Sequence, residues 1–153
     1  MSDPAVSRWK QQGRVFLWRY VENTRNYPGW HLTADAVGAR SLLELTSLMR
    51  AASWPSRTTI DLTRPTEAIL KVPNNRDGEA RWVGATRLCI RSAPELSPTH
   101  WDIRQVDDTV ELRPGSEMLA QLDRGLHDIL DGRGDYSMGG PPAELWFWRF
   151  PSP

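Results

Sequence analysis

Residues 14–22, with the sequence Arg-Val-Phe-Leu-Trp-Arg-Tyr-Val-Glu, constrain the fold more than any other segment of the chain. The segment is rich in β-branched and aromatic residues, which predicts a β-strand. Side chains alternate along a strand, so one face carries Phe16, Trp18 and Tyr20, and the other carries Val15, Leu17, Arg19 and Val21. Because both faces are largely apolar, we expect this strand to lie inside a sheet and not at its edge.

A segment near the other end of the sequence repeats the residue pattern of this strand. The segments Phe16-Leu17-Trp18-Arg19-Tyr20 and Trp146-Phe147-Trp148-Arg149-Phe150 share the order aromatic, apolar, Trp, Arg, aromatic. Each segment therefore carries three aromatic side chains on one face and a lone arginine on the other. This likeness predicts that the two terminal strands are neighbours in the sheet, with their aromatic faces aligned.

Two segments have the apolar spacing of amphipathic helices. In the first, residues 35–52, Asp35 is a suitable N-cap, and one face carries Leu42, Leu45, Met49 and Ala52. In the second, residues 116–131, Ser116 is the expected N-cap, and one face carries Met118, Leu122, Leu126 and Ile129. Gly132 is a plausible residue to end the second helix.

The clearest local prediction is a hairpin with Asp107-Asp108 as its turn. This register sets Arg104 opposite Glu111 and Asp102 opposite Arg113, and both pairs have opposite charges. The same register sets Ile103 opposite Leu112 on the other face. A slip by one residue would lose both the charge pairing and the shared apolar face, so the register is well specified.

Further strands are predicted at residues 57–62 and 82–91, and loops at residues 23–30, 73–80 and 134–143. Residues 1–12 are expected to be loosely ordered. Together these elements predict a single α+β domain over residues 1–153, with an antiparallel sheet of about six or seven strands and two main helices.

Composition narrows the function classes. The chain has 153 residues, 19 basic and 19 acidic residues, and one cysteine, Cys89. A neutral chain of this kind is not expected to bind nucleic acid or an anionic membrane through bulk charge. No Cys/His spacing indicates a metal site, and no nucleotide or cofactor fingerprint is present, so we expect no cofactor. The early residues lack the pattern of a signal peptide, which favours the cytoplasm.

The neutrality hides a division along the chain, since residues 1–76 carry a net charge of +5 and residues 77–153 a net charge of −5. The expected exposed side of the second helix is acidic. Its candidate binding residues are Glu117, Arg124, Asp128 and Asp131, with Asp135 close behind. A dense carboxylate patch is able to dock on a basic protein, including a basic toxin domain, although a solvated helix face has the same composition.

An alternative site would use the aromatic strands. Trp18 and Trp148 would line a pocket for a small molecule, and Arg19 or Arg149 would anchor an anionic group. The same tryptophans are also typical of a packed core, and the arginines of side chains that reach solvent along their stems. A deep cavity would favour the pocket, and a filled core would favour packing.

The C-terminal block resembles a group of small bacterial proteins. In this chain the block comprises a helix that ends in Gly-Arg-Gly-Asp-Tyr-Ser-Met and, after a Gly/Pro-rich loop, the sequence Leu-Trp-Phe-Trp. Some proteins of this kind are thought to be immunity proteins that neutralise a cognate toxin; the resemblance assigns no functional residues. With no catalytic constellation evident, we expect a non-catalytic protein-binding protein, with toxin neutralisation by occlusion as its leading role and a small-molecule-binding domain or small enzyme as the alternative.

Overall fold

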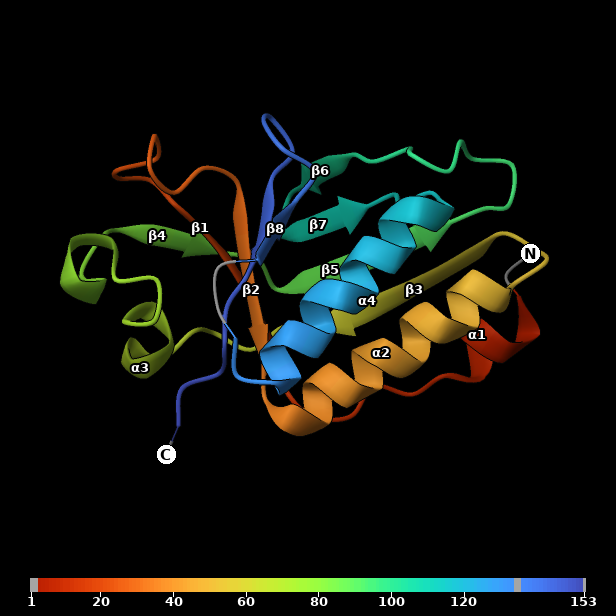
Figure 1. Cartoon of the computed structure of the whole chain (residues 1–153), viewed down its shortest axis with the longest axis horizontal. Coiled ribbons are helices and arrows are strands. Elements are labelled where there is room, and N and C mark those ends of the chain that lie inside the picture. Colours follow the sequence, from red (N-terminus) through yellow and green to blue (C-terminus); the bar gives the residue numbers. More distant parts are fainter. Residues whose placement is uncertain (1–2, 134–135, 153) are drawn as a thin grey trace.

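The computed structural model describes residues 3–133 and 136–152. Helices and strands alternate irregularly along the chain (Figure 1). In chain order the elements are α1 (Pro4–Arg8), β1 (Val15–Tyr20), β2 (Trp30–Ala34), α2 (Ala36–Ala51), β3 (Ser56–Asp61), α3 (Glu67–Leu70), the 3-10 helix η1 (Asn75–Gly78), β4 (Trp82–Gly84), β5 (Arg87–Ser92), β6 (Ile103–Val106), β7 (Thr109–Leu112), α4 (Ser116–Leu130), β8 (Tyr136–Met138) and β9 (Leu145–Phe147).

The α+β class is confirmed, but the single antiparallel sheet expected from the sequence is wrong. The described strands form a five-stranded sheet of order β4-β1-β2-β9-β8 and a four-stranded sheet of order β3-β5-β7-β6. Both sheets are mixed, because the pairs β2–β9 and β5–β7 are parallel whereas their other pairs are antiparallel.

The division into two sheets arises within residues 82–91, which the sequence pattern predicts as one strand. The first part, β4, pairs with β1, and the second part, β5, pairs with β3 and β7. Between them, the Ala85 amide donates to the Leu17 carbonyl in one sheet, and the Thr86 amide donates to the Asp108 carbonyl beside the other. The apolar residues Trp82, Leu88 and Ile90 all stand at even positions, so the sequence pattern resembles one strand across the break.

The predicted pairing of the two terminal strands is also wrong. β2 lies between β1 and β9, with Leu32 paired to Leu17 on one side and to Phe147 on the other. The sequence analysis missed β2, although Trp30, Leu32 and Ala34 alternate with polar residues, because this five-residue strand lies between a loop rich in Asn, Pro and Gly and the N-cap Asp35. The aromatic side chains of β1 and of the C-terminal segment nevertheless meet on one side of the sheet, in a common cluster.

The hairpin and both helices are confirmed. β6 and β7 pair in the predicted register, with Arg104 opposite Glu111. α2 begins after Asp35, whose Oδ1 accepts a hydrogen bond of 2.7 Å from the Gly38 amide. The predicted apolar face of α4 is buried throughout, but its N-cap is Gly115 and not Ser116.

Two apolar clusters hold the described chain together. The larger one lies between the helices α2 and α4 and strands of both sheets, and the smaller one lies on the opposite face of the five-stranded sheet beside α3. Figure 1 shows α2 and α4 side by side, while α3 lies at the far end of the molecule near β4. β1 therefore has a core on each of its faces, as its two apolar faces require.

Two segments expected to be loose or irregular carry regular structure. Within residues 1–12, α1 is helical, Val6 is fully buried, and the Trp9 indole donates a 2.9 Å hydrogen bond to the Ser41 carbonyl. The predicted loop at 134–143 contains β8, whereas the loop predicted at 73–80 is confirmed, because η1 is four residues long and Arg76 and Asp77 within it have left-handed backbone. The C-terminal strand expected to reach Phe150 is shorter in the structure, because β9 ends at Phe147.

Candidate functional site

The acidic side of α4 is already partly neutralised by cations of the same chain. Arg133 lies 3.6 Å from the Asp128 carboxylate and 3.8 Å from that of Asp131. Glu117 and Arg124 are exposed farther toward the start of the helix, and Asp135 lies outside the described residues. The surface therefore presents mixed charges and not a continuous negative patch.

Asp123, which the sequence analysis did not select, is the most connected acid of this helix. It accepts a 3.2 Å hydrogen bond from Thr46 Oγ1 of α2, and it lies 3.9 Å from Arg50 and 3.6 Å from His127. These contacts join α4 to α2. Asp123 therefore has a structural role at the contact between the two helices.

The aromatic strands form packed structure around Trp18 and Trp148. Trp18 is fully buried, Trp148 is 9% exposed, and both belong to the smaller apolar cluster. Arg19 lies over the Trp30 ring, with 5.8 Å between the guanidinium carbon and the ring centroid, and Arg149 is exposed. Because the Trp148 amide bonds to Leu32 while Arg19 pairs with Trp30, the two arginines lie at different levels of the sheet and do not form one anion site.

His31 is the centre of this aromatic cluster. Its ring stacks on three tryptophans, with centroid separations of 5.8 Å to Trp18, 6.3 Å to Trp146 and 6.1 Å to Trp148. His31 Nδ1 accepts a 2.9 Å hydrogen bond from the Trp148 indole, which assigns the ring proton to Nε2. Burial lowers the pKa of His31 from 6.5 to about 4, so this imidazole is neutral at physiological pH.

In the described part of the chain, no group of three or more His, Cys, Asp or Glu side chains is arranged to bind a metal ion. Cys89 is a buried free thiol, and Arg57 Nε donates to its sulfur at 3.4 Å. Among the same described residues, no helix combines the length and apolar character needed to cross a bilayer.

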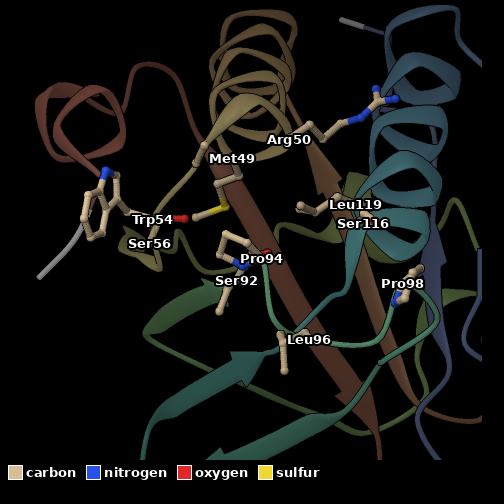
Figure 2. A pocket seen from close by; sticks show the side chains of 12 residues that line it. Met49, Arg50, Trp54, Ser56, Ser92, Pro94, Leu96, Pro98, Ser116 and Leu119 are labelled. Atoms are coloured by element: carbon tan, nitrogen blue, oxygen red, sulfur yellow. The ribbon is translucent and has the colours of Figure 1, made fainter.

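A groove with two lobes lies beside several arginine and serine side chains. Its first lobe, about 310 Å³, opens between the end of α2 and the beginning of α4 (Figure 2). About half of its wall is apolar, and this part comes from Met49, Trp54, Pro94, Leu96, Pro98 and Leu119. Trp54 is 59% exposed, an unusual position for an indole, so it offers apolar surface to a bound group.

The second lobe, about 370 Å³, is lined by Arg57, Arg91 and Arg113, with Glu95 at its wall. The two lobes adjoin, since Ser56, Ser92, Ala93 and Leu96 line both. We call the two lobes together the arginine groove. Its first lobe contributes most of the large apolar side chains and its second lobe contributes three guanidinium groups, an arrangement suited to a ligand that carries both kinds of group.

The cations of the second lobe are incompletely matched by carboxylates. Arg91 lies 3.6 Å from Glu111, which Arg104 shares at 3.4 Å, and Arg113 lies 3.8 Å from Asp102, which His100 shares at 3.0 Å. Arg57 is exposed, and no ion pair joins it to a carboxylate of the described chain. The guanidinium groups of Arg91 and Arg113 are partly exposed and their ion pairs are long, so each pair contributes little stability and an incoming carboxylate can compete for these arginines.

The sequence analysis missed this groove, although one signal for it was present. Alternation assigns Arg57, Arg91 and Arg113 to the same parity of their strands, and the pairing of β3, β5 and β7 brings them to one face. That conclusion requires knowing which strands are neighbours. The segment Trp54-Pro55-Ser56-Arg57 is a second signal, but it reads locally as the end of a helix.

Comparison with known proteins finds no matching family model, no matching curated protein and no matching solved structure. The geometry of the described side chains is therefore the basis for assigning a function.

Proposed function

We propose that this protein is a non-catalytic binding protein that recognises an acidic segment of a partner protein in the arginine groove. The observation that carries the proposal is Arg57, an exposed guanidinium beside two other arginines, with no carboxylate of the described chain paired to it. Guanidinium groups bind carboxylates through a planar fork of donors, which gives this lobe a preference for Asp and Glu side chains.

The neighbouring apolar lobe supports a protein segment as the ligand and argues against nucleic acid. An indole, a methionine and two leucines face that lobe, and they suit the apolar side chains that accompany acidic residues in a protein. Binding to nucleic acid relies on a surplus of cations along the phosphate backbone. Here Glu95, Glu111 and Asp102 lie among the arginines, and the whole chain has no net charge.

Occlusion of a basic toxin domain by the acidic face of α4 is less favoured by the contacts. Arg133 is already within ion-pair distance of Asp128 and Asp131. A partner would have to displace this arginine before it gained the full attraction of either carboxylate. Neutralisation of a toxin remains compatible with the arginine groove, in which case the recognised segment of the toxin would be acidic.

The proposal is tested by fluorescence anisotropy with a fluorescein-labelled peptide of alternating Glu and Leu residues. The matched probe has Lys in place of each Glu. We expect the acidic peptide to bind with a Kd in the micromolar range, corresponding to about −8 kcal/mol, and to bind more weakly as salt is added. The Lys peptide should not bind.

Arg57→Glu should weaken binding of the acidic peptide by at least about tenfold, because it replaces attraction by repulsion. Arg87→Glu is the matched control. Arg87 is exposed on the same strand, β5, as Arg91, but it lies beside Asp61 and outside the groove. It changes the net charge equally and should leave binding nearly unchanged.

Three outcomes would contradict the proposal. The acidic peptide could show no binding at about 1 mM, where even an interaction of about −4 kcal/mol is visible. The variants at Arg57 and Arg87 could weaken binding equally, which would indicate bulk charge. A labelled single-stranded oligonucleotide could bind more tightly than the acidic peptide, which would indicate a nucleic-acid surface.

A further inference from the structure

Ser56 has an unusual hydroxyl at the point where the two lobes of the arginine groove meet. Ser56 is the first residue of β3 and is only 4% exposed, yet its Oγ has no hydrogen-bond partner in the described part of the chain. Buried polar groups are nearly always hydrogen-bonded, because an unpaired one has lost its bonds to water without replacement. An orphaned hydroxyl beside a cavity therefore calls for an explanation.

The neighbouring Ser92 shows what a structural serine does at the same place. Ser92 pairs with Ser56 across β3 and β5, and it also lines both lobes. Its hydroxyl, however, donates a 3.0 Å hydrogen bond to the Pro114 carbonyl. Of two adjacent serines, one is satisfied inside the protein and the other is not.

The unsatisfied hydroxyl faces the first lobe. Figure 2 shows the Ser56 side chain directed toward Met49 and the interior of the pocket. Met49 presents no hydrogen-bond donor and only a weak sulfur acceptor, so the wall beside Ser56 cannot satisfy it. The oxygen itself exposes less than 1 Å², so a group that enters the pocket reaches it when the flexible Met49 side chain moves aside.

The opposite wall favours a negatively charged or carbonyl-rich ligand. It contains Ser116, the first residue of the 15-residue helix α4. The N-cap residue, Gly115, provides no side-chain hydrogen bond to this helix end, where the Pro98 carbonyl already accepts a 2.9 Å hydrogen bond from the Glu117 amide. The amino end of a helix carries a partial positive charge and attracts anions and carbonyl oxygens.

We propose that the Ser56 hydroxyl donates a hydrogen bond to a backbone carbonyl or carboxylate oxygen of the bound acidic segment, and that it is a specificity-determining residue of the groove. This inference rests on the proposed function, since it names the part of the same site that reads the ligand backbone. The segment would place its acidic side chains among Arg57, Arg91 and Arg113, and would pass over Ser56 into the lobe between α2 and α4.

If the hydroxyl binds a ligand and has no internal partner, its removal should weaken binding without lowering stability. Ser56→Ala removes a group that has no internal partner, so the free protein should be as stable as the wild type or more stable. Binding of the labelled Glu/Leu peptide should fall by about tenfold, the loss expected for one buried hydrogen bond. Stability is measured by urea unfolding, and binding by anisotropy.

Ser41→Ala is the matched control. Ser41 is 7% exposed on α2 and lies outside the groove, and its hydroxyl accepts a 2.9 Å hydrogen bond from the Gln12 amide. We expect this variant to lose stability and to keep its affinity for the peptide within about twofold. The pair of variants therefore separates a hydroxyl that holds the fold together from one that contacts ligand.

Each outcome has a distinct meaning. If Ser56→Ala binds the peptide as tightly as the wild type while Arg57→Glu does not bind, the role of Ser56 is refuted and the proposed function stands. If Ser56→Ala is less stable and binds normally, the hydroxyl has an internal partner and the inference is again refuted. If the wild-type protein fails to bind the acidic peptide at all, the proposed function itself fails.

Discussion

Acidification should destabilise this protein through His31. The imidazole is fully buried, stacked among tryptophans, and hydrogen-bonded as an acceptor to the Trp148 indole. Protonation would place a charge in an apolar cluster and remove that acceptor. The folded state therefore favours neutral His31, which is why its pKa lies at about 4 and not at 6.5.

The size of the effect follows from the two pKa values. The unfolded chain begins to bind a proton at His31 below 6.5, whereas the folded protein resists until the pH approaches 4. Stability is therefore complete above the unfolded pKa and falls as the pH decreases through this window. The loss amounts to about 2 kcal/mol at about pH 5 and about 3 kcal/mol once both states are protonated.

Urea unfolding at about pH 7 and at about pH 5, followed by the fluorescence of the eight tryptophans, measures this loss. His31→Gln removes the titrating group and keeps a side chain with an acceptor oxygen. The variant should be less stable than the wild type at neutral pH. Between about pH 7 and about pH 5, however, it should lose about 2 kcal/mol less unfolding free energy than the wild type does.

His127→Gln is the matched control, because the His127 side chain is 60% exposed on α4 and lies outside the aromatic cluster. It should retain nearly all of the wild-type pH dependence, because its exposed pair with Asp123 contributes little stability. If His31→Gln and the wild type lose the same free energy of unfolding on acidification, the argument from burial is refuted.

Two further substitutions test the packing of the helices. Gly125→Ala should destabilise the protein by about 1–3 kcal/mol in urea unfolding, because a Cβ there would lie 2.6 Å from the Phe147 ring, and crowding of a filled core is costly. Asp35→Ala should lower the unfolding free energy by about 1–2 kcal/mol, since Asp35 Oδ1 accepts from the amides of Gly38 and Arg14 at 2.7 and 3.0 Å. Unchanged urea midpoints in either variant would contradict the corresponding contact.

The sequence predicts local structure correctly where one segment determines its own conformation. The turn at Asp107 and the opposite charges of Arg104 and Glu111 specify the hairpin without reference to the rest of the chain. The apolar spacing of α2 and α4 does the same, because each helix buries one stripe. The N-cap of α4 was missed because Ser116 resembles a capping residue, whereas Gly115 has the extended backbone of the cap.

The sequence does not predict which strands pair with each other, because pairing depends on segments far apart in the chain. The likeness between β1 and the C-terminal segment suggested direct contact, yet both pack their aromatic faces into one cluster while β2 separates them. Similar faces indicate a shared side of a sheet and not adjacency within it.

The arginine groove was hidden for the same reason. Its cationic lobe draws on β3, β5 and the end of β7, and its apolar lobe on α2, α4 and the chain after β5. No single segment contains more than a fraction of the site. The unpaired hydroxyl of Ser56 is likewise invisible in sequence, because an orphaned atom is defined by what surrounds it.

The central position of β2 has a consequence for the protein during its synthesis. One edge of β2 pairs with β1 as soon as both have been made, but the other edge waits for β9, and Thr33 reaches its Trp148 partner across 115 residues. At ribosomal rates this interval is roughly ten seconds. Throughout it, a nascent chain carries an apolar strand with one bare edge, a template for aggregation that only the last strand removes.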